Sequence, residues 1–223
     1  RRWGDIHIHP FNKPLDSHPE ILEILKTETM TRNNGGRWHS DQMYTAKPAK
    51  ATILYAREMP PVGGDTMFSN AHLALEGLSE GVRRTLEGLR GVNNGDSRKH
   101  PSGMTRRERE AAGIGTIAQI DPGEVQTVSV HPVVRTHPET GRKSLYVGGH
   151  TERFDGMSDE ESAPLLSFLQ AHATRPEYLC RLRWEVGTLT MWDNRCTQHF
   201  AINDYDGHRR CVHKITIAGD SPY

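Results

Sequence analysis

The sequence predicts a single, mainly β domain with helical insertions, of the β-sandwich or jelly-roll type. Three observations predict it. Short runs of alternating apolar and polar residues recur along the chain, and Gly, Pro, Asn and Asp separate them. Only a few segments follow helical spacing. The length of 223 residues fits one sizeable domain and leaves little room for two.

Composition and charge exclude several classes of function. The formal net charge of +0 argues against an electrostatic nucleic-acid binder, which normally carries a basic excess. No apolar run approaches the length of a membrane span, so no membrane partner is expected. The three cysteines, Cys180, Cys196 and Cys211, are scattered, which argues against a disulfide scaffold and favours a reducing, cytoplasmic compartment.

The first half of the chain supplies four predicted strands. Alternation predicts strands within residues 1–10, 21–27 and 51–57, and another begins at 66–69. Because a strand occurs so close to Arg1, we expect more chain to precede it in the native protein.

Two short helices should follow these strands. Asn70 can cap a helix over 71–78, and Ser79 can cap a second over 80–89. Helical spacing relates the apolar residues Leu78, Val82, Leu86 and Leu89.

Residues 91–128 form the least regular segment. The stretch 93–96 is typical of a turn, and 106–110 is strongly charged. A solvated surface helix explains the charged run better than a phosphate-binding patch does. A long connection in a compact domain can also serve as a lid over an active site, and we keep that hypothesis for 91–128.

The second half alternates strands with one long helix. A strand over 128–136 contains Pro132, which favours an edge position, and it should pair through a hairpin loop with 144–147. Ser158 and Glu161 form a capping box for a helix that reaches about Ala173. Its expected buried stripe is Leu165, Leu166, Phe168 and Leu169, and the expected final strands are 178–184, 188–192 and 211–217.

A His-x-Asp pattern at His39 and Asp41 is the first candidate site. On extended backbone, side chains two residues apart share a face, so both could bind one metal ion. Alone the pattern is weak, because two polar residues on a surface strand would look the same. His199, after the predicted strand 188–192, offers a third ligand. Two histidines and one carboxylate suit non-haem Fe(II).

Adjacent arginines near the C-terminus are the second candidate. Arg209 and Arg210 should point to opposite faces of a strand, and an inward guanidinium requires an anionic partner. Its planar fork fits a carboxylate, to which Thr66 could add a hydroxyl. The alternative is a surface ion pair with Asp204 or Asp206.

These motifs give the chain its resemblance to a known family. It resembles the Fe(II)- and 2-oxoglutarate-dependent dioxygenases of the taurine dioxygenase and 2,4-dichlorophenoxyacetate dioxygenase (TauD/TfdA) family. The matching stretches cover nearly the whole chain in family order: 4–10, 38–41, 61–66, 131–138, and 192–199 continuing to Arg210. Family members usually carry a substantial segment before the first of these.

The resemblance implies a fold and a set of cofactors. The fold would be a double-stranded β-helix, the jelly roll of clavaminate synthase-like proteins. His39, Asp41 and His199 would be the catalytic iron ligands, and Fe(II), 2-oxoglutarate and O2 the reactants at the metal. Arg210 would hold the distal carboxylate of 2-oxoglutarate, assisted by Thr66.

The resemblance also implies a substrate site, with one departure. His9 and Gln42 fall where taurine-type members contact the anionic head of the substrate. A second arginine, four residues after the cosubstrate arginine, is Lys214 here. Lysine keeps the positive charge but loses the two-pronged donor, so a taurine assignment does not transfer.

The activity implied is hydroxylation of a small organic anion with release of succinate and CO2. Sulfonates, sulfate esters and aryloxyalkanoates are the substrate classes considered, and none is favoured. Asp41 favours hydroxylation, because related halogenating enzymes lack this carboxylate. Two alternatives stay open at this point: a non-catalytic jelly-roll module that binds metal or ligand, and a zinc hydrolase. A homo-oligomer, a dimer or tetramer, is expected.

Overall fold

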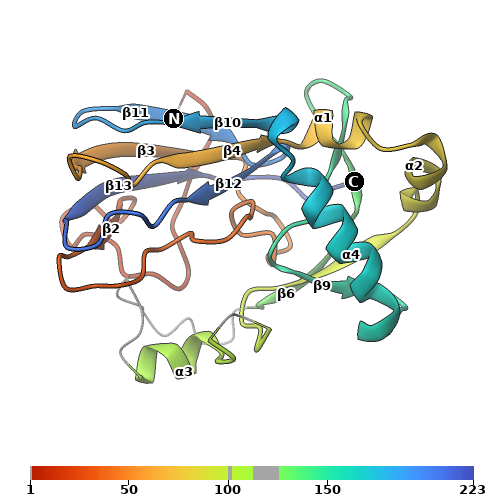
Figure 1. The fold of residues 1–223 in the computed structure, drawn as a ribbon, viewed down its shortest axis with the longest axis horizontal. Coiled ribbons are helices and arrows are strands. Elements are labelled where there is room, and N and C mark those ends of the chain that lie inside the picture. Colours follow the sequence, from red (N-terminus) through yellow and green to blue (C-terminus); the bar gives the residue numbers. More distant parts are fainter. Residues whose placement is uncertain (1, 100–101, 113–125) are drawn as a thin grey trace.

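A computed structural model of the chain describes residues 2–99, 102–112 and 126–223. Two facing antiparallel sheets form its body (Figure 1). The large sheet has the order β1 (Ile6–His7), β13 (Arg210–Ile217), β3 (Ala51–Glu58) and β11 (Leu189–Asp193), and β2 (Leu22–Lys26) also pairs with β13. The small sheet has the order β10 (Leu179–Leu182), β4 (Thr66–Asn70) and β12 (Thr197–Ala201).

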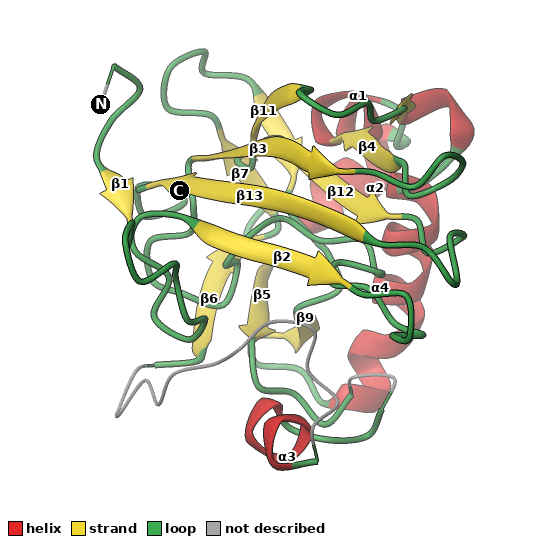
Figure 2. Cartoon of the chain, turned by 90° about the vertical axis from the view of Figure 1, so that its left-hand side faces the viewer, coloured by secondary structure: helices red, strands yellow, loops and turns green. Residues whose placement is uncertain are grey.

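Two further sheets extend this body. One contains β6 (Val128–Pro132), β5 (Arg90–Asn94) and β9 (Thr151–Phe154), and the other pairs β7 (Val134–Thr136) with β8 (Lys143–Leu145). Pro132 lies in β6, an edge strand, as its missing N–H predicts. Figure 2 shows the large sheet toward the viewer, with the smaller elements behind and below it.

Helices lie beside the sheets, and α1 (Ala71–Glu76), α2 (Glu80–Leu86) and α4 (Asp159–Ala173) begin at the predicted caps. The other helical elements of the described residues are α3 (Arg106–Ala111) and a 3₁₀ turn at Pro176–Tyr178. Asn70 and Ser79 accept hydrogen bonds from the first backbone N–H groups of α1 and α2. Ser158 and Glu161 form the capping box of α4. No helix of the described residues combines the length and apolar character needed to cross a bilayer.

Buried apolar side chains pack the layers together in two clusters. The cluster between the two main sheets contains Leu54, Ala56, Trp184, Trp192 and Val212, with Phe68 packed against it. The other lies beneath α1, α2 and α4 and contains, among others, Leu75, Leu86, Val133, Phe154 and Leu169. The chain is therefore a mainly β jelly roll with helical insertions, as predicted.

Several local predictions were wrong. Phe168 is 48% exposed, because Leu166, Leu169 and Ala173 occupy the face of α4 that meets the core. Asn93 and Asn94, expected in a turn, belong to β5, and no strand was predicted where β9 and β12 form. Short strands with Asn, Gly and His are formed by pairing with neighbours, which local composition does not reveal.

The segment 91–128 is only partly described. The charged run within it forms α3, in agreement with the surface-helix interpretation. Residues 100–101 and 113–125 of the lid hypothesis lie outside the described residues.

Candidate metal and cosubstrate site

A backbone bridge brings the two distant metal-ligand segments together. The N–H of His39 donates to the carbonyl of His199 at 3.1 Å, and the N–H of His199 donates back at 2.8 Å. The Ser40 hydroxyl adds a bond to the carbonyl of Thr197. The His-x-Asp stretch thus extends the small sheet beside β12, which places it at the inter-sheet space.

The three predicted ligands converge at this bridge. Nε2 of His39 lies 3.7 Å from Oδ1 of Asp41, and Nε2 of His199 lies 4.0 Å from the same oxygen. One donor atom from each residue lies within 4.8 Å of the other two. Metal–ligand bonds of about 2.1 Å place neighbouring donors about 3.0–3.4 Å apart. The two measured His–Asp distances therefore fit one metal ion after contractions of at most about 1 Å.

Hydrogen bonds fix which oxygen of Asp41 faces the histidines. Its Oδ2 accepts from the Thr52 hydroxyl at 2.5 Å and from Nζ of Lys214 at 2.8 Å. Its backbone N–H donates to Oδ1 of Asn194, whose amide nitrogen donates to Thr52. Oδ1 of Asp41 is left as the atom directed at His39 and His199, so a metal would meet a single carboxylate oxygen.

The histidine rings are also held in orientation. Nδ1 of His39 donates to the carbonyl of Arg37 at 2.7 Å, which leaves the lone pair on Nε2 for a metal. The ring of His199 packs against Trp192 at 4.7 Å and Phe68 at 6.4 Å between centroids. Its Nδ1 is buried without a hydrogen-bond partner among the described residues.

Electrostatics hold all three ligands in their metal-binding protonation states. Burial lowers the pKa of His39, and burial together with His39 lowers the pKa of His199 well below the usual value. Burial alone would raise the pKa of Asp41, but Lys214 and the histidines outweigh it and hold that pKa far below its usual range. At neutral pH the site presents one carboxylate and two neutral imidazoles.

The second predicted pair, Arg210 and Thr66, lies between the same sheets. Arg210 is 6% exposed, whereas Arg209 faces solvent and pairs with Glu58. Arg210 donates through Nε to the carbonyl of Gly64, and no carboxylate of the described chain lies within 4.0 Å of its guanidinium. Trp184 packs beside that guanidinium and donates to the Thr66 hydroxyl at 2.9 Å.

Strand alternation places this pair on the same inward faces as the metal ligands. In β13, Arg210 and Lys214 are four residues apart and therefore share a face. In β4, Thr66 is two residues from Phe68, which is opposite His199 in register. The inter-sheet space thus has a metal-ligand cluster and, beside it, a buried arginine with a threonine hydroxyl.

The three predicted substrate residues differ in their side-chain contacts. Lys214 lies against Asp41, as described above. His9 is buried and accepts at Nδ1 from the N–H groups of Phe11 and Asn12. Gln42 adopts a positive φ of 58° and is buried, and neither atom of its amide forms a hydrogen bond with the described residues. Their substrate roles remain predictions.

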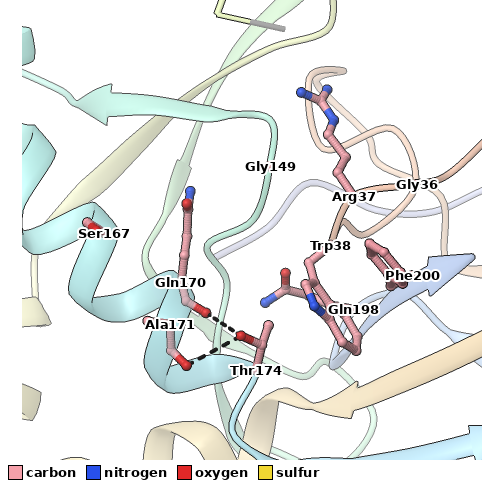
Figure 3. Close-up of a pocket in the computed structure, with 10 residues that line it drawn as sticks. All are labelled: Gly36, Arg37, Trp38, Gly149, Ser167, Gln170, Ala171, Thr174, Gln198 and Phe200. Atoms are coloured by element: carbon pink, nitrogen blue, oxygen red, sulfur yellow. Dashed lines mark hydrogen bonds between the residues drawn. The ribbon is translucent and has the colours of Figure 1, made fainter. Parts of the chain in front are cut away.

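A cavity of about 460 Å³ lies between α4 and β12, the strand that carries His199. Figure 3 shows residues of α4 on one side of it and Trp38, Gln198 and Phe200 on the other. Gln198 and Phe200 flank His199 in β12, so their side chains point to the opposite face of the strand. This cavity is therefore separate from the metal-ligand cluster.

Sequence reasoning missed three residues that build the site. They are Thr52, Asn194 and Trp184, which hold Asp41 or Thr66 by hydrogen bonds. Thr52 and Trp184 look like ordinary strand residues. Asn194 could have been suspected from its position, because it directly follows the strand that precedes His199.

Fold and site together describe a jelly-roll protein with two histidines and one carboxylate that could hold a metal ion. A family model described as the taurine catabolism dioxygenase TauD, TfdA family matches residues 1–216. The chain belongs to this family.

Relatives with described activities agree with this membership. The chain is 35% identical over 212 residues to an alkylsulfatase of Acinetobacter baylyi, covering 95% of this chain and 65% of that protein. It is 36% identical over 188 residues to an alpha-ketoglutarate-dependent 2,4-dichlorophenoxyacetate dioxygenase of Cupriavidus pinatubonensis, covering 82% and 60%. A taurine dioxygenase structure from Burkholderia xenovorans superposes with a TM-score of 0.77 at 35% identity, covering 99% of this chain and 70% of that one. The chain thus spans 65% and 60% of the length of these two curated relatives.

Proposed function

We propose that the protein is an Fe(II)- and 2-oxoglutarate-dependent dioxygenase that hydroxylates a small organic anion and releases succinate and CO2. The observation that carries this proposal is the pairing of two features. One is the convergent set of His39, Asp41 and His199. The other is Arg210, a buried cation with no carboxylate partner in the described chain, beside the Thr66 hydroxyl.

The bound iron would supply the coordination and redox chemistry by which 2-oxoglutarate and O2 oxidise a substrate. His39 and His199 donate imidazole nitrogens and Asp41 donates Oδ1. Thr52 and Lys214 hold the other oxygen of Asp41, so Oδ1 would be the oxygen available to the metal. Arg210 holds the distal carboxylate of 2-oxoglutarate by a charge-assisted bond, and Thr66 adds a hydrogen bond.

The substrate class rests on charge and on relatives. The relatives are named as an alkylsulfatase, a 2,4-dichlorophenoxyacetate dioxygenase and a taurine dioxygenase, and alkyl sulfates, 2,4-dichlorophenoxyacetate and taurine all carry an anionic group. Lys214, with His9 and Gln42, would recognise the anion. An ammonium has three N–H donors, and Asp41 takes one of them. Oxidation at a carbon that bears sulfur or oxygen would release the anionic group.

The alternatives account for fewer residues. A module that only binds a metal gains nothing from a buried arginine that lacks an acidic partner, since that residue costs solvation energy. A zinc hydrolase would use the same three ligands but would leave Arg210 and Thr66 without a role.

The direct test measures oxygen-dependent succinate release from 2-oxoglutarate with Fe(II), ascorbate and a panel of sulfonates, sulfate esters and aryloxyalkanoates. At least one anion should stimulate succinate release above the uncoupled background. Absence of succinate with every anion, in protein that binds Fe(II), would favour the binding module.

Two variants separate 2-oxoglutarate binding from substrate binding. Arg210→Ala should raise the 2-oxoglutarate requirement about 10- to 150-fold, which corresponds to about 1.5–3 kcal/mol for a charge-assisted bond. Arg209→Ala, its exposed neighbour, is the matched control. With saturating metal, Lys214→Ala should weaken substrate binding more than 2-oxoglutarate binding; an equal loss of both would show that Lys214 acts only through Asp41.

The remaining properties are inferred from composition and resemblance. The scattered free cysteines support a cytoplasmic location. A homo-oligomer, dimer or tetramer, is proposed from the resemblance, and light scattering of the purified protein would test it.

A further inference from the structure

The outer face of the large sheet carries a second group of metal-ligating side chains. Cys211 and His213 are two residues apart in β13 and so share a face. Glu23 of β2 is opposite His213 in register. Because side chains alternate along β13, this face is opposite the one that carries Arg210 and Lys214.

The distances from Glu23 to the other two donors match a tetrahedral metal site. Sγ of Cys211 lies 3.6 Å from Oε2 of Glu23, and Nε2 of His213 lies 3.6 Å from the same oxygen. All three donors lie within 4.8 Å of one another. A zinc ion with bonds of about 2.3 Å to sulfur and about 2.1 Å to nitrogen or oxygen separates its tetrahedral ligands by about 3.4–3.6 Å.

The carboxylate of this group is not neutralised by a basic side chain. No lysine or arginine of the described residues lies within 4.0 Å of the Glu23 carboxylate. A third group of possible ligands, His137, Asp193 and Cys196, differs in this respect. There, Arg195 donates several hydrogen bonds to the carboxylate of Asp193, which makes that group a salt bridge.

We propose that Glu23, Cys211 and His213 bind a zinc ion, with water as the fourth ligand. Thiolate, imidazole and carboxylate are the ligand types that zinc takes in proteins. Such an ion would link β2 to β13, the strand that carries Arg210 and Lys214 on its inner face. Without a metal, burial and Glu23 raise the pKa of Cys211 to about 11, so the ion must displace the thiol proton.

The test uses Co²⁺ as a spectroscopic probe of the full chain. Co²⁺ bound to a thiolate gives an intense near-ultraviolet charge-transfer band, which the cysteine-free site at His39, Asp41 and His199 cannot give. Titration should develop this band to one equivalent. Cys211→Ser should abolish it, and Cys180→Ser, which changes an exposed cysteine, should leave it unchanged.

Further variants keep the test decisive if Cys211→Ser fails to fold. Glu23→Gln and His213→Gln change partly exposed side chains, and each should weaken Co²⁺ binding at the thiolate site about tenfold or more. Competition with a chromophoric chelator should find two zinc ions per wild-type chain and one in His199→Ala, with the thiolate band retained in that variant. Absence of a thiolate band in the wild type, or its persistence in Cys211→Ser, would overturn the proposal without affecting the proposed iron site.

Discussion

Replacing Lys214 by methionine tests how the metal-free site tolerates its buried carboxylate. Nζ of Lys214 lies 2.8 Å from Oδ2 of Asp41, and the two side chains are 13% and 9% exposed. Methionine keeps most of the volume and removes the charge. Asp41 would then keep only the Thr52 hydroxyl at that oxygen.

The magnitude follows from the distance and the burial. At 2.8 Å and an effective dielectric of about 20, the Coulomb attraction is about 6 kcal/mol. Desolvation of the ammonium offsets part of it, and breaking a buried pair by removing one partner typically costs about 3–5 kcal/mol. We expect a loss of that size in the metal-free protein. A bound divalent cation also neutralises Asp41, so the loss should shrink when metal is present.

Urea denaturation with and without chelator measures the loss of stability in the metal-free protein and in the metal-bound protein. Lys143→Met is the matched control, because Lys143 pairs with Glu87 at the surface, where such a pair contributes about 0–1 kcal/mol. If Lys214→Met in chelator loses no more stability than Lys143→Met, or if metal does not reduce the loss, the electrostatic account of Asp41 is wrong.

Three further changes test other parts of the structure. Asn194→Ala removes hydrogen bonds to Asp41, Thr52 and Trp192, and it should cost about 3 kcal/mol or more of unfolding free energy and weaken metal binding. Unchanged metal affinity would show that Asn194 does not position Asp41. Burial raises the pKa of Tyr146 to about 12, so the unfolded chain loses this phenol proton first. Stability should therefore fall as pH rises from about 10 to 12, by up to roughly 3 kcal/mol, and Tyr146→Phe should remove that part in alkaline denaturation. Gly64→Ala places a methyl 3.2 Å from Cδ of Arg210 at φ +72°, and it should raise the 2-oxoglutarate requirement. Gly187→Ala, at φ +90° in open space, should cost similar strain and leave that requirement unchanged.

The ligand types and the strand alternation were predictable from the sequence. The two-residue spacing of His39 and Asp41 placed both donors toward one ion, and the adjacency of Arg209 and Arg210 predicted one exposed and one buried guanidinium. The helix caps at Asn70, Ser79 and Ser158 were predictable because capping depends on local hydrogen bonds.

What could not be predicted depends on pairing between distant segments. The bridge between His39 and His199 joins residues 160 positions apart, and β12 forms by pairing with β4, from a stretch without strand signals. The contact between Lys214 and Asp41 likewise requires β13 and β3 to pair, with the His-x-Asp segment next to both strands. Thr52 supports Asp41 only because β3 lies centrally in the large sheet.

Anaerobic spectroscopy of the iron complex tests the central claim most directly. Addition of Fe(II) and then 2-oxoglutarate without oxygen should produce the weak visible charge-transfer band of the chelate. His199→Ala should abolish the band, and Arg210→Ala should require about 10- to 150-fold more 2-oxoglutarate to produce it, with Arg209→Ala unchanged. A wild-type protein that binds Fe(II) but shows no band at saturating 2-oxoglutarate would contradict the assignment of this site.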